Sequence, residues 1–359
     1  MQRSASLAWI ASMKTPDPVL AADLSGMLAA LLPWEALHGR HILVTGASGF
    51  IGGHVVEALV WLNRRQPQAK VHVYALARDL AKLRQRMPWL DIPGEVTPLI
   101  QDVTQPCGLA APLDFIVHAA SPASPKDYLQ RPVDTIRANT DGTRALLELA
   151  RDKQARFLFL SSGAVYGDNP WQTDAIAEGD FGREDPLAPR ACYGESKRLA
   201  ETLCQAYHTQ YGVDARIARI SHCYGPGMRL DDGRAISDLL ADVLHNRDIQ
   251  LDSDGSASRP FCYVSDTVLG LFHILFRGEA GHAYNVGETQ ETSILELAEK
   301  LIASAGKAGQ LTVRPQARSG PAPAVRNAGH FNIDKIRALG WAPLTPLDVG
   351  LSRLLQAHT

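Results

Sequence analysis

The stretch TGASGFIGGH, residues 45–54, decides the fold, because it places evenly spaced glycines between two different structural patterns. The apolar run HILV before it is typical of a strand, and an apolar helical pattern follows it directly. Its G-x-x-G-x-x-G spacing allows a tight turn and lets the backbone approach a pyrophosphate at the helix N-terminus. The strand before and the helix after it support a dinucleotide-binding turn. The cofactor-binding residues predicted in this turn are Gly46, Ser48, Gly49, Phe50, Ile51 and Gly52.

The same alternation of strand and helix continues along the chain. Short β-branched or apolar runs predict strands at residues 41–46, 70–77, 96–103, 114–120, 155–162 and 214–221. Longer amphipathic patterns predict helices between them, at residues 52–63, 134–152 and 192–212. Strands that alternate with helices in this way predict an α/β fold of the Rossmann type, with a doubly wound parallel sheet.

The pattern divides the chain into three parts. Residues 1–38 have helical spacing bounded by prolines, and we expect an N-terminal helical extension that packs against the main body. Residues 39–225 are predicted to form the dinucleotide-binding Rossmann domain with the catalytic residues. The spacing becomes irregular after that point, so residues 226–359 are predicted to form mainly a smaller C-terminal substrate-binding lobe, with some segments returning to the sheet.

The composition limits the classes of partner. The chain has 36 basic and 38 acidic side chains and a net charge of -2, which gives no electrostatic reason to expect a nucleic-acid partner. Its five cysteines form no C-x-x-C pair, so we expect reduced thiols and no metal site. No run approaches the ~20 apolar residues of a membrane helix. We therefore expect a cytoplasmic protein without a membrane partner.

The ends of the next predicted strands indicate where the rest of a dinucleotide would bind. Strand 70–77 ends in YALARD and places Ala77 where an acidic residue normally binds the adenosine ribose of NAD. Arg78 follows and suits the 2′-phosphate of NADP, so the sequence favours NADP, while Asp79 leaves NAD open. The later predicted cofactor contacts are Asp102 beside the adenine, Val103, Ala119, Ala120 and Ser121.

Candidate catalytic residues follow in the motif YGESK. Tyr193 and Lys197 are four residues apart, so both face the same side of a helix. A lysine in this position would lower the pKa of the phenol and could hold the nicotinamide ribose, which makes Tyr193 a candidate acid or base. Ser162, at the end of strand 155–162, would give the reacting oxygen a second hydrogen bond. We predict these three as catalytic, and the tyrosine and lysine also as cofactor contacts.

These motifs together resemble the extended short-chain dehydrogenase/reductases of the nucleotide-sugar epimerase/dehydratase family. The resemblance covers roughly residues 41–345 and rests on TGASGFIG, HAASPASP, SSGAVYG, YGESK, CYGPGM, RPFCYVSD and YNVG. The segments 118–150 and 233–266 look most like the UDP-glucuronate decarboxylase branch. The resemblance implies a nicotinamide cofactor that oxidises a nucleotide sugar at C4 to a ketone. It also implies a homodimer formed by helices flanking the sheet.

The resemblance also suggests substrate-binding residues. It places Arg234 and Arg259, with Tyr263 nearby, at the nucleotide diphosphate. Guanidinium groups suit this role, because they pair with phosphate oxygens through two parallel hydrogen bonds. His222 stands where the family commonly has an asparagine, and we expect it to bind substrate as a neutral hydrogen-bonding group. With Ser162, these residues form the predicted substrate site.

The stretch SSGAVYG departs from the family at two positions. Family dehydratases and decarboxylases usually carry a glutamate at the position of Ala164, and dehydratases add an aspartate at the position of Gly163. Neither residue present here can transfer a proton. The sequence therefore favours 4-epimerisation or simple C4 oxidation and reduction, with UDP-glucuronate-type decarboxylation as the alternative. A 4,6-dehydratase and a pseudoenzyme that only binds nucleotide sugar rank lower.

Overall fold

The computed structural model describes residues 17–167, 175–316 and 329–358. The strands are β1 (His41–Thr45), β2 (His72–Ala77), β3 (Thr97–Ile100), β4 (Phe115–His118), β5 (Arg156–Ser162), β6 (Ala175–Ile176), β7 (Ala215–Ile220), β8 (His222–Tyr224), β9 (Ile249–Gln250), β10 (Ser258–Tyr263), β11 (Ala283–Val286), β12 (Glu291–Ser293), β13 (Val313–Arg314) and β14 (His330–Phe331). The helices are α2 (Pro18–Leu28), η1 (Trp34–Leu37), α3 (Phe50–Arg65), α4 (Leu80–Arg86), α5 (Pro125–Gln130), α6 (Pro132–Lys153), η2 (Gly163–Tyr166), α7 (Ala191–Tyr211), α8 (Ala235–Leu244), α9 (Val264–Arg277), α10 (Ile294–Ser304), α11 (Asp334–Arg337) and α12 (Leu347–Gln356).

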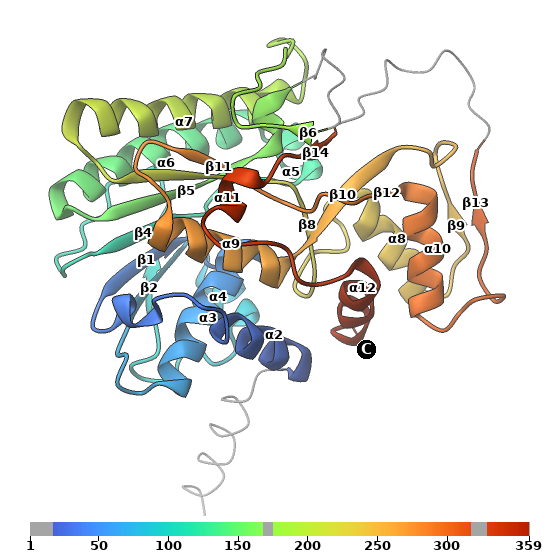
Figure 1. Cartoon of the computed structure of the whole chain (residues 1–359), viewed down its shortest axis with the longest axis horizontal. Helices are drawn as coiled ribbons and strands as arrows, with labels where there is room; N and C mark the ends of the chain where they lie inside the picture. Colours follow the sequence, from blue (N-terminus) through green and yellow to red (C-terminus); the bar gives the residue numbers. More distant parts are fainter. Residues whose placement is uncertain (1–16, 168–174, 317–328, 359) are drawn as a thin grey trace, which may run out of the picture.

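A seven-stranded parallel sheet forms the centre of the molecule (Figure 1). Its strand order is β11-β7-β5-β4-β1-β2-β3, so the chain reverses its direction of progress between β1 and β4. Crevices that bind dinucleotides lie at such a reversal, outside the carboxyl ends of the strands. The doubly wound α/β fold predicted from the sequence is therefore confirmed, and the carboxyl edge between β1 and β4 is where a cofactor would bind.

All six predicted strands belong to this sheet, and a seventh comes from the C-terminal part of the chain. β11 pairs with β7 in register from Ala283 opposite Ile217 to Val286 opposite Ile220. Parallel strands covered on both faces are apolar along their whole length, and β1 shows this with four of its five residues buried. The apolar runs identified in the sequence are therefore strands of the buried sheet.

Helices cover both faces of the sheet, and each face has its own hydrophobic core. α6 and α7 pack on one face over a cluster that includes Leu43, Leu147 and Phe157. α3 and α9 lie on the other face, together with α2 (Figure 1). These layers hold the carboxyl ends of the strands in fixed positions.

A smaller lobe is built from the C-terminal half of the chain (Figure 1). A three-stranded sheet in the order β12-β10-β8 packs with α8, α10 and α12 around a third hydrophobic cluster. β8 follows β7 directly in sequence, so this lobe begins at the same edge of the large sheet as the expected cofactor crevice.

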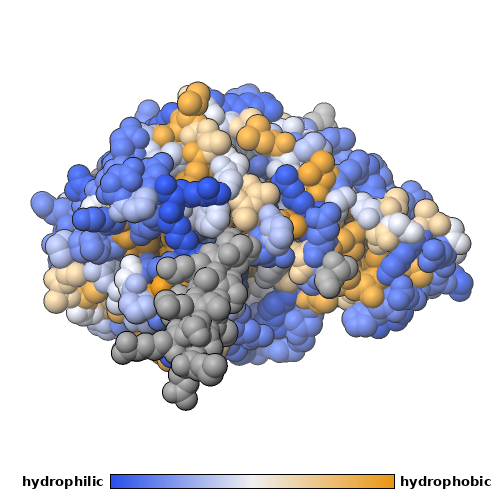
Figure 2. Space-filling view, turned by 90° about the horizontal axis from the view of Figure 1, so that it is seen from below, coloured by the Kyte–Doolittle hydropathy of each residue, from blue (hydrophilic) through white to orange (hydrophobic). Residues whose placement is uncertain are grey.

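The described part of the N-terminal extension packs against the main body through α2, while residues 1–16 lie outside the described residues. Asp17 caps α2 by accepting a hydrogen bond from the Val19 backbone N–H at 2.7 Å. Within the described residues, no helix has the length and apolar character needed to cross a membrane. On the face shown in Figure 2, hydrophilic residues predominate and apolar residues form separate patches.

Candidate active site

The glycine-rich turn connects β1 to α3 and leaves no room for side chains. Gly46 has a φ of +66°, and a Cβ atom there would lie 2.7 Å from the carbonyl oxygen of Ala119. A Cβ atom at Gly52 would lie 2.5 Å from the carbonyl oxygen of Gly46. Gly49 caps α3 without a side-chain hydrogen bond, and the first turn of this helix has no acidic residue. The backbone is thus open to an anion at the helix N-terminus, as a dinucleotide pyrophosphate requires.

We predict that Gly52→Ala weakens dinucleotide binding at least ~10-fold, because the first turn of α3 must move away from the Gly46 carbonyl group. Calorimetric titration with NAD and NADP measures the effect. Gly26→Ala is the matched control, since a Cβ atom there meets nothing within 4 Å. Equal affinity in the two variants would contradict the placement of the pyrophosphate at this turn.

The predicted adenosine contacts lie at the ends of β2 and β3. Arg78 and Asp102 face each other, with 4.0 Å between Nη1 and Oδ2. Asp102 also accepts hydrogen bonds from the backbone and hydroxyl group of Thr104 at 2.9 and 2.8 Å. Asp79 caps α4 instead, because its Oδ1 accepts from the Ala81 N–H at 2.8 Å. This capping contact engages the carboxylate that had left NAD open, while the Arg78 side chain is 56 % exposed at the end of β2.

The predicted contacts after β4 complete the crevice. The Ala120 N–H donates to the Thr45 hydroxyl group at 3.3 Å, which ties the end of β4 to the end of β1. Val103 is buried and packs against Gly142 of α6. The Ser121 hydroxyl group is buried and has no hydrogen-bond partner within the described part of the chain. A buried orphan hydroxyl beside the glycine turn is consistent with a ligand that supplies the partner, so the residues present fit a dinucleotide.

The structure brings Tyr193 and Lys197 together on one face of α7. The Lys197 ammonium group lies 5.9 Å from the centre of the Tyr193 ring. It also donates to the carbonyl oxygen of Leu160 at 2.7 Å and lies 4.6 Å from the centre of the Phe159 ring. Burial lowers the pKa of Lys197 to about 7, although the nearby Glu201 acts to raise it. This lysine is therefore partly neutral near pH 7 before any ligand binds.

Ser162 meets Tyr193 at the end of β5. Its hydroxyl group accepts from the Ala164 backbone N–H at 3.2 Å and caps η2, which fixes its direction. Burial raises the pKa of Tyr193, while a hydrogen bond to Ser162 and the charge of Arg234 act to lower it. The expectation that the lysine holds the phenol pKa below its ordinary value is therefore wrong, because burial is the larger effect.

Tyr128 is a site residue that sequence reasoning missed. Its ring stacks on that of Tyr193, with 5.2 Å between ring centres and 14° between planes. It lies on α5, which Ser124 caps by accepting from the Asp127 N–H at 3.2 Å. The signal was present in SPKDYLQRP, where a serine followed by a proline begins a helix directly after the cofactor crevice. A second phenol thus faces the candidate catalytic tyrosine.

Three predicted substrate residues gather beside this pair. Burial, and then the charges of Arg259 and Arg234, lower the pKa of His222 to about 4. The direction of this shift favours the neutral imidazole at pH 7. The Arg234 charge also acts on both Tyr193 and Tyr128. Arg234 thus acts on His222 and on both tyrosines, while Arg259 acts on His222, and guanidinium groups of this kind suit an anionic ligand.

Tyr263 does not join this group, and its prediction as a diphosphate contact is wrong. Its side chain is only 1 % exposed and packs against Tyr224, with 5.5 Å between ring centres. Its hydroxyl group donates to Asp23 of α2 at 2.7 Å, and Asp23 also pairs with Arg353 at 2.7 Å. This tyrosine instead joins the N-terminal extension to the smaller lobe.

Residue 163, where family dehydratases carry an aspartate, has little room for a side chain. A Cβ atom at Gly163 would lie 2.8 Å from the ring of Phe331. Phe331 is 5 % exposed and packs edge-on against Tyr166, with 5.6 Å between ring centres. An aspartate therefore does not fit at residue 163 without movement of this ring.

The Rossmann sheet, with a phenol, a lysine and a serine at the same edge as the glycine turn, defines an enzyme of the short-chain dehydrogenase/reductase class. The chain belongs to the NAD dependent epimerase/dehydratase family, whose model matches residues 42–287.

Similar proteins and structures support this assignment. The chain is 35 % identical to UDP-glucuronic acid decarboxylase 1 of Xenopus tropicalis over 320 residues, 88 % of this chain and 71 % of that protein. It is 39 % identical to UDP-glucuronic acid decarboxylase 6 of Arabidopsis thaliana over 261 residues, 72 % of each chain. The UDP-glucose 4-epimerase of Thermotoga maritima, solved with UDP-glucose, has a similar fold, with a TM-score of 0.74, 22 % identity and coverage of 89 and 98 % of the two chains. The dTDP-glucose 4,6-dehydratase DesIV of Streptomyces venezuelae, solved with NAD, has a TM-score of 0.72, 27 % identity and coverage of 89 and 97 %.

Proposed function

We propose that this protein oxidises a nucleotide sugar at C4 and acts as a 4-epimerase or a C4 oxidoreductase. The observation that carries the proposal is the retention of Ser162, Tyr193 and Lys197 in one group, beside Gly163 and Ala164 in place of acids. A bound nicotinamide dinucleotide would supply the hydride acceptor and donor. The three retained side chains are enough to move the proton that accompanies hydride transfer.

Each side chain has a defined part in this proposal. Tyr193 removes the proton from the C4 hydroxyl group and later returns it, so no further acid is needed for epimerisation. Ser162 donates a hydrogen bond to the same oxygen, because its direction is fixed by the η2 cap. Lys197 supplies a positive charge beside the phenol when it is protonated. Arg234 and Arg259 bind the diphosphate, and the neutral His222 contacts the sugar as a hydrogen-bonding group.

Decarboxylation of a UDP-uronic acid is the second candidate. The two decarboxylases that are 35 and 39 % identical to this chain over the aligned residues favour it. A 4-keto uronic acid is a β-keto acid and loses carbon dioxide readily once C4 is oxidised, so Ala164 weighs less against this outcome. A 4,6-dehydratase must expel a hydroxyl group from C6, for which residues 163 and 164 offer no acid. A pseudoenzyme would have no need to retain the catalytic group.

A panel of nucleotide sugars incubated with the purified protein separates these outcomes by product mass. Unchanged mass with a new retention time supports the epimerase, and a change of two hydrogens with cofactor turnover supports the oxidoreductase. Loss of carbon dioxide establishes the second candidate. Loss of water would contradict the argument from Ala164, and tight binding without turnover would indicate a pseudoenzyme.

For the cofactor we propose a preference for NADP over NAD through Arg78. The family and the solved relatives are associated with NAD. Ala77 nevertheless removes the acid that binds the ribose, and Asp79 is occupied by the α4 cap. We predict that Arg78→Ala lowers the NADP-to-NAD affinity ratio ~10-fold, the effect of losing one charge-assisted pair. Titration with both nucleotides measures it, and release of only NAD from the denatured wild-type protein would contradict the proposal.

We also propose a homodimer formed through α6 and α7. Ile136 on α6 is 41 % exposed and Leu199 on α7 is 50 % exposed, although both helices border the catalytic group.

A cytoplasmic location is proposed as well, because all five cysteines lie within the described residues and none forms a disulfide.

We predict that Leu199→Arg converts the dimer to a monomer, because the charged side chain cannot be buried between two copies without a partner. Light scattering coupled to size-exclusion chromatography measures the mass. Leu344→Arg is the control at an apolar residue that is 72 % exposed and lies away from these helices. A monomeric wild-type protein, or an unchanged dimer in the Leu199 variant, would contradict the proposed interface.

A further inference from the structure

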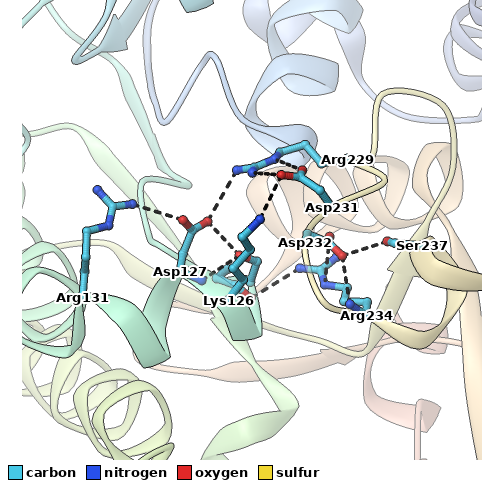
Figure 3. Close-up of polar contacts among 10 residues, drawn as sticks. Lys126, Asp127, Arg131, Arg229, Asp231, Asp232, Arg234 and Ser237 are labelled. Atoms are coloured by element: carbon cyan, nitrogen blue, oxygen red, sulfur yellow. Dashed lines mark hydrogen bonds and ion pairs between the residues drawn. The ribbon is translucent and has the colours of Figure 1, made fainter. Parts of the chain in front are cut away.

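The segment between β8 and α8 lies against α5, and Arg234 is held where the two meet (Figure 3). The Lys126 backbone N–H donates to the carbonyl oxygen of Asp232 at 3.5 Å. Arg234 Nη2 donates to the carbonyl oxygen of Ala123 at 3.4 Å. The guanidinium group therefore reaches from the smaller lobe to the end of the cofactor crevice.

The Asp232 carboxylate holds Arg234 from the opposite side. This side chain is only 7 % exposed. Its Oδ1 accepts from the Arg234 backbone N–H at 3.0 Å and from the Ser237 hydroxyl group at 2.8 Å, and its Oδ2 lies 3.5 Å from Arg234 Nε. One carboxylate thus fixes both the backbone from which the arginine starts and the direction of its guanidinium group (Figure 3).

The neighbouring Asp231 has a different role. Its side chain is 61 % exposed and pairs with Lys126 at 3.2 Å and Arg229 at 3.0 Å. Exposed ion pairs of this kind contribute little, because water and salt screen them. Asp231 therefore offers the same chemical change as Asp232 one residue away, without contact to Arg234 in Figure 3.

The far end of Arg234 acts on the candidate active site. Its positive charge affects the titration of His222 on β8 and of Tyr193 on α7. The other charge that acts on His222 is Arg259 on β10. The contact with the Ala123 carbonyl oxygen also places the guanidinium group beside the start of α5, whose Tyr128 stacks on Tyr193.

We propose that Asp232 is a positioning residue, which holds the Arg234 guanidinium group toward His222 and Tyr193, ready to bind the diphosphate of a nucleotide sugar. An arginine that is already fixed loses less rotamer freedom when its ligand binds. The inference rests on the proposed function for the identity of that ligand.

The first experiment follows the titration of His222 by NMR in wild-type protein, Asp232→Asn and Asp231→Asn, with His222→Asn to identify the signal. Loss of the Asp232 negative charge alone would lower the His222 pKa. Release of the arginine removes a positive charge and raises the pKa above its value of about 4, while burial and Arg259 continue to lower it, so a rise reports the movement of Arg234. We expect this rise in Asp232→Asn and no change in Asp231→Asn. If Asp232 only caps α8, its variant melts earlier but His222 titrates as in wild type, which would overturn the inference.

The second experiment measures the affinity for uridine diphosphate and the KM and kcat for the sugar that the panel identifies. Asp232→Asn should raise both Kd and KM about 10-fold with kcat changed less than about threefold, and Asp231→Asn should match wild type. An unchanged affinity in Asp232→Asn would overturn the role in substrate binding. Failure of wild-type protein to bind or convert any nucleotide sugar of the panel would contradict the proposed function instead, and the NMR titration would still decide the role of Asp232.

Discussion

Replacing Tyr193 with phenylalanine should lower kcat about 10³-fold, while the affinity for nucleotide sugar and cofactor changes little. The hydroxyl group is the only part removed, and it is the group that takes the C4 proton in the proposed reaction. The ring that stacks against Tyr128 at 5.2 Å remains, so the local packing is kept. Single-turnover measurement of nicotinamide absorbance reports hydride transfer directly, and ligand titration reports binding.

Tyr128→Phe is the matched control for this variant. It removes a hydroxyl group from the other ring of the same stacked pair. We expect a much smaller loss of kcat, because the partner of Ser162 is Tyr193 and not Tyr128. Full activity in Tyr193→Phe, or equal losses in both variants, would refute the assignment of the catalytic acid and base.

Replacing Lys197 with methionine should have two opposite effects. We expect kcat to fall about 10³-fold, because the phenol loses the positive charge beside it. We also expect the protein to melt ~3 °C higher at pH 7, since the burial cost of an ammonium group is removed. The residue is 3 % exposed, and that cost is the reason for its lowered pKa. Calorimetry across a pH series measures the second effect.

The pH dependence gives the sign of this stability change. Between pH 7 and the ordinary lysine value of 10.5, the unfolded chain holds a proton at residue 197 that the folded chain has lost. The contribution of Lys197 to the free energy of unfolding of the wild-type protein therefore rises across that range. The advantage of the methionine variant should be largest at or below pH 7 and should shrink toward pH 10. Lys82→Met, at an exposed lysine of α4, is the control, and a constant difference at every pH would contradict the argument.

The central fold could be predicted because strands of the covered parallel sheet such as β1 and β4 are nearly continuous apolar runs. β11 could not, because its four residues include the polar Asn285. That side chain is satisfied only in the folded protein, where its amide donates to Ile176 and its oxygen accepts from the Tyr166 hydroxyl group at 2.5 Å. These partners lie 109 and 119 residues away in sequence. The local sequence pattern therefore does not indicate these hydrogen-bond partners.

The candidate site was predictable where a motif fixes spacing within one element, as for Tyr193 and Lys197 on α7. It was not predictable where two elements meet. Tyr128 joins the site through a ring contact between α5 and α7. Tyr263 does not lie in the site, because its hydroxyl group donates a hydrogen bond to Asp23, which is 240 residues earlier in the sequence. The pKa of the Tyr193 phenol depends on burial, which the spacing of residues in the sequence does not reveal.

The contact between residue 163 and Phe331 also limits the evolutionary paths open to this chain. An aspartate at residue 163 would strike a ring that is held in place by Tyr166, so that mutation alone carries a steric cost. Only after Phe331 becomes a smaller residue does the cost disappear. The order of mutations therefore matters: an aspartate at residue 163 becomes acceptable only after a change on β14, 168 residues away in sequence.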